Sequence, residues 1–270
     1  MPNQTINNLK EWEVEMAVSG AITIKQPRMV LHVEKGVSHP FLTTVTISKV
    51  PHGCRMTMIA RAYTQETAND AAVYFLGQAL DILCIKLNIP LYLSLFQPEF
   101  RSSDSHIRRL VSQEEWENAF IEGRRLGIDR RFISRAISWY RKGLISDDPI
   151  DKVIAYWSAL EAVASNFYRP TNRTKLGVIN QICDCFVQLW GPVPNWKVIP
   201  GEPDIINQFH DFRNGFSHGF KSVDIDTIRE VLVHLPRYES LVYTFLFDWI
   251  NEGYKFECST IVQEGLQNIS

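Results

Sequence analysis

The hydrophobic pattern of this chain changes its period near residue 64, and this change limits the folds that the chain can adopt. Before it, short runs alternate apolar and polar residues, which is typical of strands. After it, apart from one short apolar run, apolar residues recur every three or four positions, which is typical of amphipathic helices. A group of strands followed by a group of helices predicts an α+β protein.

Four strand-forming runs precede the change, at residues 12–24, 29–33, 43–47 and 55–60, and turn residues around Pro27, Gly36 and Gly53 separate them. This pattern predicts an antiparallel β-meander with one face that needs cover. A helix expected at 68–87, with Thr67 as its N-cap and Pro90 beyond its end, would cover that face. Residues 91–96 predict one further strand.

Three parts follow from this pattern: a β-rich α+β module at 1–100, a linker with connecting helices at 101–147, and a helical domain at 148–270. Ser112 and Glu115 form a capping-box pattern that predicts a helix ending near Gly127. Asp129 is the expected cap of the next helix, and Gly143 is its expected end.

Basic residues are in excess between residues 101 and 143, where ten Lys or Arg stand against six Asp or Glu. Two interpretations are open. The excess is the solvated face of two helices, or it is a surface that follows a phosphate backbone. Over the whole chain the net charge is −2, which argues against a general nucleic-acid coat protein.

The composition, 45% hydrophobic and 21% charged, is that of a globular protein. No apolar run is long enough to span a bilayer, so no membrane partner is expected. Five cysteines, an odd number, and the lack of an export signal predict free thiols in the cytoplasm. Cys183 and Cys185 face different sides of a predicted helix, so we expect no zinc site and no cofactor.

Four helices are expected between residues 148 and 251, starting near residues 148, 174, 204 and 224. Glu161 lies on the apolar stripe of the first, four residues beyond Trp157, and a carboxylate there needs a partner. Arg213, seven residues beyond Ile206, borders the apolar stripe of the third. The two positions predict an Arg213–Glu161 ion pair.

Residues 213–218 combine the side chains that metal-free RNA cleavage needs. The planar guanidinium of Arg213 binds phosphate oxygens, and Asn214 follows it directly. His218 can take up or release a proton near neutral pH, at the ribose 2′-hydroxyl or at the leaving oxygen. Gly215 and Gly219 would let the chain leave the helix, which would bring His218 beside Arg213.

Spacing alone does not single out this site, because Arg101 with His106 and Arg229 with His234 have the same spacing. Only Arg213 is followed by Asn. A structural ion pair, with a His at a helix end, remains an alternative, as does nucleotide or RNA binding without cleavage. Four basic residues nearby are candidate RNA contacts, or solvated surface residues if they lie elsewhere: Arg169, Arg173, Lys175 and Lys221.

Residues 148–251 resemble a HEPN domain. The residues Arg213-Asn214 followed by His218 fit the HEPN Arg-x4–6-His motif. Residues 156–161, Tyr-Trp-Ser-Ala-Leu-Glu, resemble the first-helix pattern of the Apea-like and methylamine-utilisation-accessory branches. The resemblance implies an all-helical bundle and a metal-independent endoribonuclease. Arg213, Asn214 and His218 would be catalytic, with Glu161 in support, and two motifs would face one cleft in a homodimer or larger homo-oligomer.

The resemblance also leaves a second function open. HEPN proteins include inactive members that act as scaffolds, toxin partners or nucleotide binders. The alternative is therefore a binding or assembly protein whose partner is a nucleotide, RNA or another protein. The expected setting for the ribonuclease is stress or phage defence, with RNA as substrate and a regulatory protein as a further candidate partner.

Overall fold

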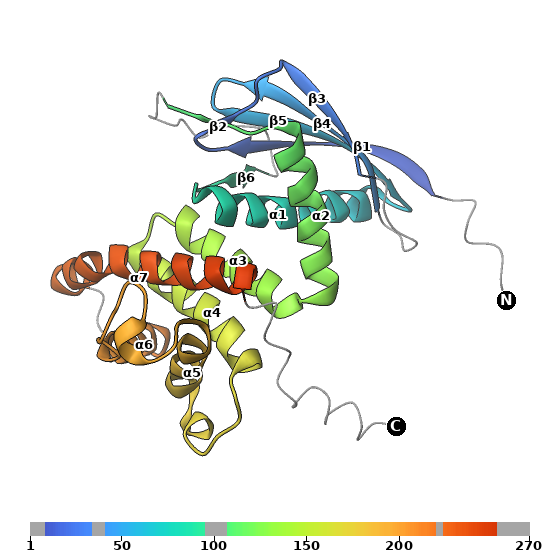
Figure 1. The fold of residues 1–270 in the computed structure, drawn as a ribbon. Helices are drawn as coiled ribbons and strands as arrows, with labels where there is room; N and C mark the ends of the chain where they lie inside the picture. Colours follow the sequence, from blue (N-terminus) through green and yellow to red (C-terminus); the bar gives the residue numbers. More distant parts are fainter. Residues whose placement is uncertain (1–8, 34–40, 95–106, 220–223, 253–270) are drawn as a thin grey trace, which may run out of the picture. The chain divides into compact units, whose positions relative to one another are not determined.

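The computed structural model describes residues 9–33, 41–94, 107–219 and 224–252 (Figure 1). The chain forms two compact units, Met1–Asp129 and Arg130–Ser270, and the connecting segment predicted at 101–147 is shared between them. The first unit contains an antiparallel sheet and the second contains helices, so the predicted α+β class is confirmed.

Five strands form the main sheet of the first unit, in the order β3-β4-β5-β1-β6. Their bounds are β1 Lys10–Ser19, β3 Arg28–His32, β4 Phe41–Val50, β5 Gly53–Ala62 and β6 Tyr92–Ser94. Strands β3, β4 and β5 follow one another as a meander. Strand β1 pairs with β5 along its whole length, from Lys10 opposite Ala62 to Ser19 opposite Gly53. A separate parallel pair joins β2, Ile22–Thr23, to β7, Arg109–Leu110.

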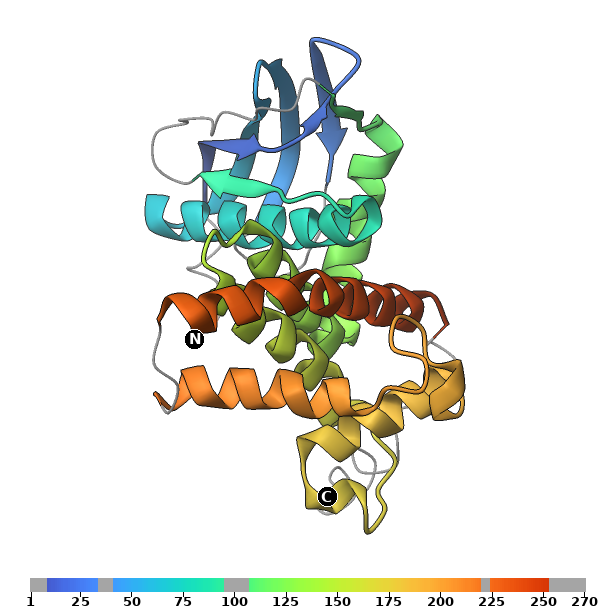
Figure 2. The same ribbon diagram turned by 90° about the vertical axis from the view of Figure 1, so that its left-hand side faces the viewer.

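Helix α1, Gln65–Leu87, packs against β1, β4 and β5 and covers one face of the sheet, as predicted (Figures 1 and 2). Its N-cap is Thr64, so the assignment to Thr67 was wrong. Thr67 is the third helical residue, and its amide donates to the Thr64 hydroxyl over 3.2 Å. The helix closes at Asn88, which adopts the left-handed conformation.

Helix α2, Gln113–Asp129, opens with the predicted capping box. The Ser112 amide donates to Glu115 Oε2 over 2.8 Å, and the Glu115 amide donates to Ser112 Oγ over 3.1 Å. The helix continues past Gly127 and packs on α1. A Cβ on Gly123 would lie 2.8 Å from the Gln78 carbonyl oxygen, so a glycine is needed at this approach.

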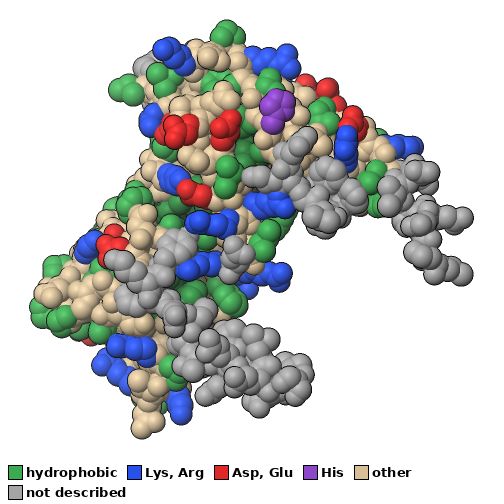
Figure 3. All heavy atoms as spheres, turned by 45° about the vertical axis from the view of Figure 1, so that its right-hand side comes forward, with side chains coloured by type: hydrophobic (Ala, Val, Ile, Leu, Met, Phe, Trp, Pro, Cys, Tyr) green, Lys and Arg blue, Asp and Glu red, His purple; other side chains and the backbone are tan. Residues whose placement is uncertain are grey.

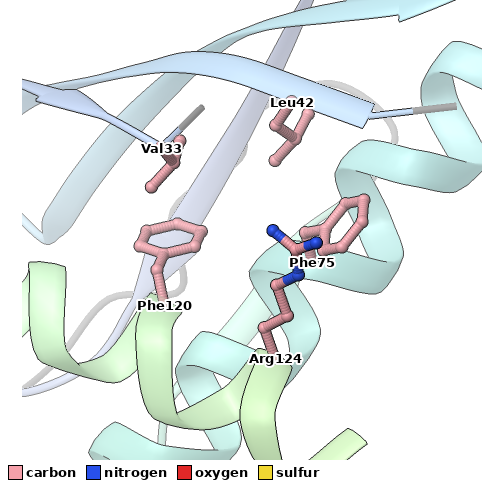
Figure 4. A pocket seen from close by; sticks show the side chains of 5 residues that line it. All are labelled: Val33, Leu42, Phe75, Phe120 and Arg124. Atoms are coloured by element: carbon pink, nitrogen blue, oxygen red, sulfur yellow. The ribbon is translucent and has the colours of Figure 1, made fainter. Parts of the chain in front are cut away.

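An apolar pocket of about 20 Å³ lies inside the first unit (Figure 4). Val33 and Leu42 reach it from the sheet side, and Phe75 and Phe120 reach it from α1 and α2. The side chain of Arg124 lies beside Phe75. The pocket is close to the volume of one water molecule, so it is a packing gap and not a ligand site.

Five α-helices form the second unit: α3 Arg131–Ile145, α4 Pro149–Phe167, α5 Val178–Trp190, α6 Asp204–Ser217 and α7 Ile225–Glu252. Short 3-10 turns, η2 at Thr174–Leu176 and η3 at Val193–Asn195, lie before and after α5. Asp148 caps α4, where Oδ1 accepts from the Ile150 amide over 2.7 Å. The N-cap of α3 is Arg130, so the prediction of Asp129 was wrong.

Helix α4 is central to the second unit and packs against α3, α5, α6 and α7. Its buried Trp157 makes an edge contact with Phe209 of α6 at 5.4 Å between ring centroids. Phe209 stacks on Tyr238 of α7 at 4.0 Å, and α6 and α7 run side by side (Figures 1 and 2). These aromatic contacts fix α6, the helix that carries Arg213.

Candidate functional site

Arg213 lines an open cavity of about 360 Å³ in the second unit. Helix α3 contributes Phe132, Arg135 and Trp139, and helix α4 contributes a row that includes Ser158, Glu161 and Ser165. In both helices these residues recur at spacings of three or four, which places them on one face. The cavity exists because α4 presents small side chains where α3 and α6 present long ones.

Arg213 and Glu161 lie together, as the sequence predicted. Arg213 Nη2 is 3.7 Å from Glu161 Oε2, and the two side chains are 28% and 38% exposed. This distance is too long for a hydrogen bond, so the contact is a loose, partly solvated ion pair. Glu161 therefore faces the cavity, not the packed interior that its position on the apolar stripe suggested. Arg213 Nε is buried and has no hydrogen-bond partner within the described part of the chain.

Asn214 links Arg213 to His210. Arg213 Nη1 donates to Asn214 Oδ1 over 2.9 Å, and Asn214 Nδ2 lies 2.9 Å from Nε2 of His210. The His210 ring packs on the ring of Trp157, with 5.2 Å between centroids. We did not predict His210. The available signal was its position four residues before Asn214, on the same face of α6.

His218 is exposed and lies at the C-cap of α6. The helix continues through Gly215, which is buried, so the expectation that Gly215 loosens the helix was wrong. The chain leaves the helix at Gly219, which has a φ of 69°. An unbroken helix separates the Cα atoms of Arg213 and His218 by about 140° around its axis. The helix does not bring the two side chains together by itself.

Arg169 and Arg173 line a different cavity, of about 260 Å³, together with Cys183 and Asp184. Arg169 donates to Asp184 Oδ1 from Nε and Nη2, over 3.0 and 2.6 Å, and this hydrogen bonding raises the pKa of Arg169. Arg173 Nε donates to Asn180 over 3.1 Å.

These basic residues do not line the Arg213 cavity. Lys175 is exposed in η2, and Lys221 lies outside the described residues. On the face drawn in Figure 3, several Lys and Arg side chains are visible outside the part that uncertain residues cover.

The two other Arg-x4-His pairs differ from the one on α6. On α7, Arg229 is exposed and lies 3.4 Å from Asp226, one turn away on the same helix. His234 lies 3.1 Å from Gln208 Nε2 and packs near Phe212. Arg101 and His106 lie outside the described residues.

The described ranges contain neither a metal-binding cluster nor a helix suited to a membrane. In them, no group of three or more His, Cys, Asp or Glu side chains is placed to hold a metal ion. None of the helices found there combines the length and the apolar character needed to cross a membrane. Cys183 and Cys185 are both free thiols, and burial raises the pKa of both.

The resemblance to HEPN proteins rests on the sequence motifs quoted above alone. Comparison of the chain with protein-family models, with curated protein sequences and with solved structures finds no match.

Proposed function

We propose that the second unit is a metal-independent endoribonuclease of HEPN type that acts as a homodimer on RNA. The observation that carries this proposal is the position of Arg213. It lines an open cavity, and its guanidinium is held by Asn214 and only loosely paired with Glu161. An Arg with five N–H donors and so few contacts keeps donors for phosphate oxygens.

In this proposal Arg213 holds the non-bridging oxygens of the scissile phosphate and stabilises the charge that develops on them. The ribose 2′-oxygen forms a bond to phosphorus, and the bond from phosphorus to the 5′-oxygen breaks. A base takes the proton of the 2′-hydroxyl, and an acid gives a proton to the leaving 5′-oxygen. His218 fills one of these two roles, and Asn214 orients the guanidinium.

The helix geometry favours an active centre shared by two copies. Arg213 and His218 start from different sides of α6, separated by about 140°. In a two-fold dimer, Arg213 of one copy can meet the partner's His218, and the symmetry creates two such centres. The HEPN resemblance implies a homodimer in which both motifs line one cleft, and the pairing of Arg213 with the partner's His218 is our addition to it. We place the activity in the cytoplasm, in stress or phage defence, under the control of a regulatory protein.

The test is cleavage of a mixed RNA in the presence of a metal chelator. Because general acid–base catalysis contributes about 10²- to 10⁴-fold, His218→Ala should lower the rate by at least about 100-fold. His218 is exposed, so the variant should fold normally, which circular dichroism can check. Wild type and His218→Ala giving the same products at the same rate would overturn the proposal.

A binding protein without cleavage is the second candidate, and the Arg213–Glu161 pair favours it. A carboxylate so close to the guanidinium competes with a phosphate in the same place. If this candidate is correct, wild type binds RNA or nucleotides but leaves RNA intact with and without metal. Binding would still fall in Arg213→Ala, which a fluorescence-anisotropy titration would show.

A further inference from the structure

The α3 side of the Arg213 cavity carries two exposed or half-exposed aromatic rings. Phe132 is 43% exposed, and Trp139 is half-buried seven residues further on, with Arg135 between them. Lys142 Nζ lies 4.2 Å from the centroid of a Trp139 ring, so one face of the indole is covered by an ammonium group. Because Trp139 lines the cavity and is only half-buried, its indole offers aromatic surface on which a flat ligand can stack.

The α4 side of the cavity presents hydrogen-bond acceptors. Ser158 Oγ donates to the Ile154 carbonyl and Ser165 Oγ donates to the Glu161 carbonyl, both over 2.7 Å. Asn166 Nδ2 donates to the Ala162 carbonyl over 3.0 Å. Because the side-chain protons are used within α4, the oxygen atoms are what these residues offer to a ligand. The Glu161 carboxylate adds two more acceptor oxygens.

Two guanidinium groups provide the donors. Arg135 comes from α3 and Arg213 from α6. Arg135 is exposed and forms no ion pair with any residue that the structure describes. A volume of about 360 Å³ falls within the range of pockets for small organic ligands. The ligand must therefore combine an anion, a flat ring and N–H donors on that ring.

We propose that the Arg213 cavity is a nucleobase-binding subsite for a base that carries an amino group: adenine, cytosine or guanine. The phosphate lies at Arg135 and Arg213, the base stacks on Trp139, and its amino group donates to the α4 acceptors. Uracil has no amino group and offers only its ring N3–H as a donor, so it binds more weakly. This inference rests on the proposed function, because it assigns the base next to the scissile phosphate.

The test uses the full chain carrying His218→Ala, titrated with AMP, CMP, GMP, UMP and ribose 5-phosphate and followed by calorimetry. Base stacking on an aromatic side chain is worth about 1–3 kcal/mol, which is about 5- to 150-fold in Kd. The three amino-bearing nucleotides should therefore bind at least about 5-fold more tightly than ribose 5-phosphate. The Kd of UMP should lie between that of ribose 5-phosphate and those of the three amino-bearing nucleotides.

Three substitutions in the cavity and one control outside it locate the subsite. In Trp139→Leu, the Kd values of the nucleotides should come close to that of ribose 5-phosphate. Trp139→Phe should retain most of the difference in Kd. Phe247→Leu is the matched control, because Phe247 is an exposed aromatic residue of α7 that does not line the cavity. Glu161→Gln should reduce the difference in Kd between the amino-bearing nucleotides and UMP, because it replaces an acceptor oxygen with a donor.

The possible outcomes separate this inference from the proposed function. Equal Kd values for all five ligands would overturn the base subsite, and so would tightest binding of UMP or binding of none of them. If wild type cleaves RNA but any of these results is found, the ribonuclease stands and the subsite fails. If the nucleotides bind as expected but RNA is not cut, the subsite stands and the ribonuclease fails.

Discussion

Two Arg-x4-His pairs with the same spacing lie in one helical unit, and their surroundings differ. Arg213 on α6 lines a cavity, bonds to the next residue, Asn214, and faces a carboxylate from another helix. Arg229 on α7 has a carboxylate from its own helix, 3.4 Å away, with both side chains largely in solvent. Spacing is a property of the sequence, whereas a site requires a cavity and partners from other helices.

The two histidines differ in exposure, and here the α6 residue is the more exposed one. His218 on α6 is exposed at the end of its helix, whereas His234 on α7 is half-buried and lies against Gln208, Phe212 and Tyr238. A proton-transferring group must reach its substrate. The α6 pair therefore has an accessible His and a cavity-lining Arg, whereas the α7 pair has an exposed Arg and a packed His.

The largest difference should appear when the two arginines are removed separately. Arg213→Ala removes the group that we propose to stabilise phosphate charge, and loss of one such donor costs about 10²- to 10³-fold in rate. Arg229→Ala removes a surface residue and should change the RNA cleavage rate by less than about 2-fold. Initial cleavage rates of both variants on one RNA measure this difference, and urea unfolding checks that both variants are folded. Equal effects would remove the distinction between the two pairs.

Mixing two inactive variants tests whether the α6 pair works across a dimer. Arg213→Ala and His218→Ala are each expected to be inactive alone. If the centre joins Arg213 of one copy to the partner's His218, a mixed dimer has one intact centre and one inactive centre. Random mixing makes half of the dimers mixed, so about a quarter of the wild-type rate should be restored. Rates measured after subunit exchange decide this. If mixing restores nothing although exchange is shown by mass spectrometry, the shared centre is wrong.

Replacing His210 should change the cleavage rate less than replacing Arg213 or His218. We expect His210→Ala to free the Asn214 amide, which then holds Arg213 less well. The cleavage rate should fall by no more than about 10-fold, because one hydrogen bond contributes about 0.5–1.5 kcal/mol. His210→Gln keeps an acceptor on this helix face and should recover part of the rate. The control is His234→Gln on α7, which should leave the rate unchanged. A rate in His210→Ala equal to that of wild type would show that Asn214 does not depend on His210.

Local pattern predicted the elements well, and its errors concern two helix caps and the role of one glycine. Helices α2 and α3 end at Asp129 and Ile145, close to the glycines Gly127 and Gly143 that were expected to end them, whereas Gly215 lies inside α6 and does not loosen it. A Cβ on Gly127 would lie 2.2 Å from Gln78 Nε2, and one on Gly143 would lie 2.3 Å from Tyr156 Cε1. Glycine allows close approach as well as turns. Only the three-dimensional contact distinguishes the two uses.

The candidate site was predicted in part. Arg213 and Glu161 were expected to meet because each borders an apolar stripe, and they do. The contribution of α3 was not foreseen, because its basic residues were considered only as part of the excess at residues 101–143. Their role in the cavity depends on the small side chains of α4 opposite them. Such a pairing joins segments that are distant in sequence, so it is not visible in either segment alone.

The smallest effect should come from the carboxylates of the two pairs. A partly exposed ion pair contributes about 0–1 kcal/mol, so Glu161→Ala should change the free energy of unfolding by less than about 1 kcal/mol. It should nevertheless raise the affinity for inorganic phosphate by several-fold, because the competing anion at Arg213 is gone.

Asp226→Ala is the matched change on α7, where the carboxylate is 94% exposed and Arg229 lines neither the 360 Å³ nor the 260 Å³ cavity. Its phosphate affinity should equal that of wild type. Calorimetric titration with phosphate compares the two variants directly. If Glu161→Ala and Asp226→Ala bind phosphate equally well, Glu161 does not hold the guanidinium against an anion, and Arg213 has no advantage over Arg229 as a phosphate ligand.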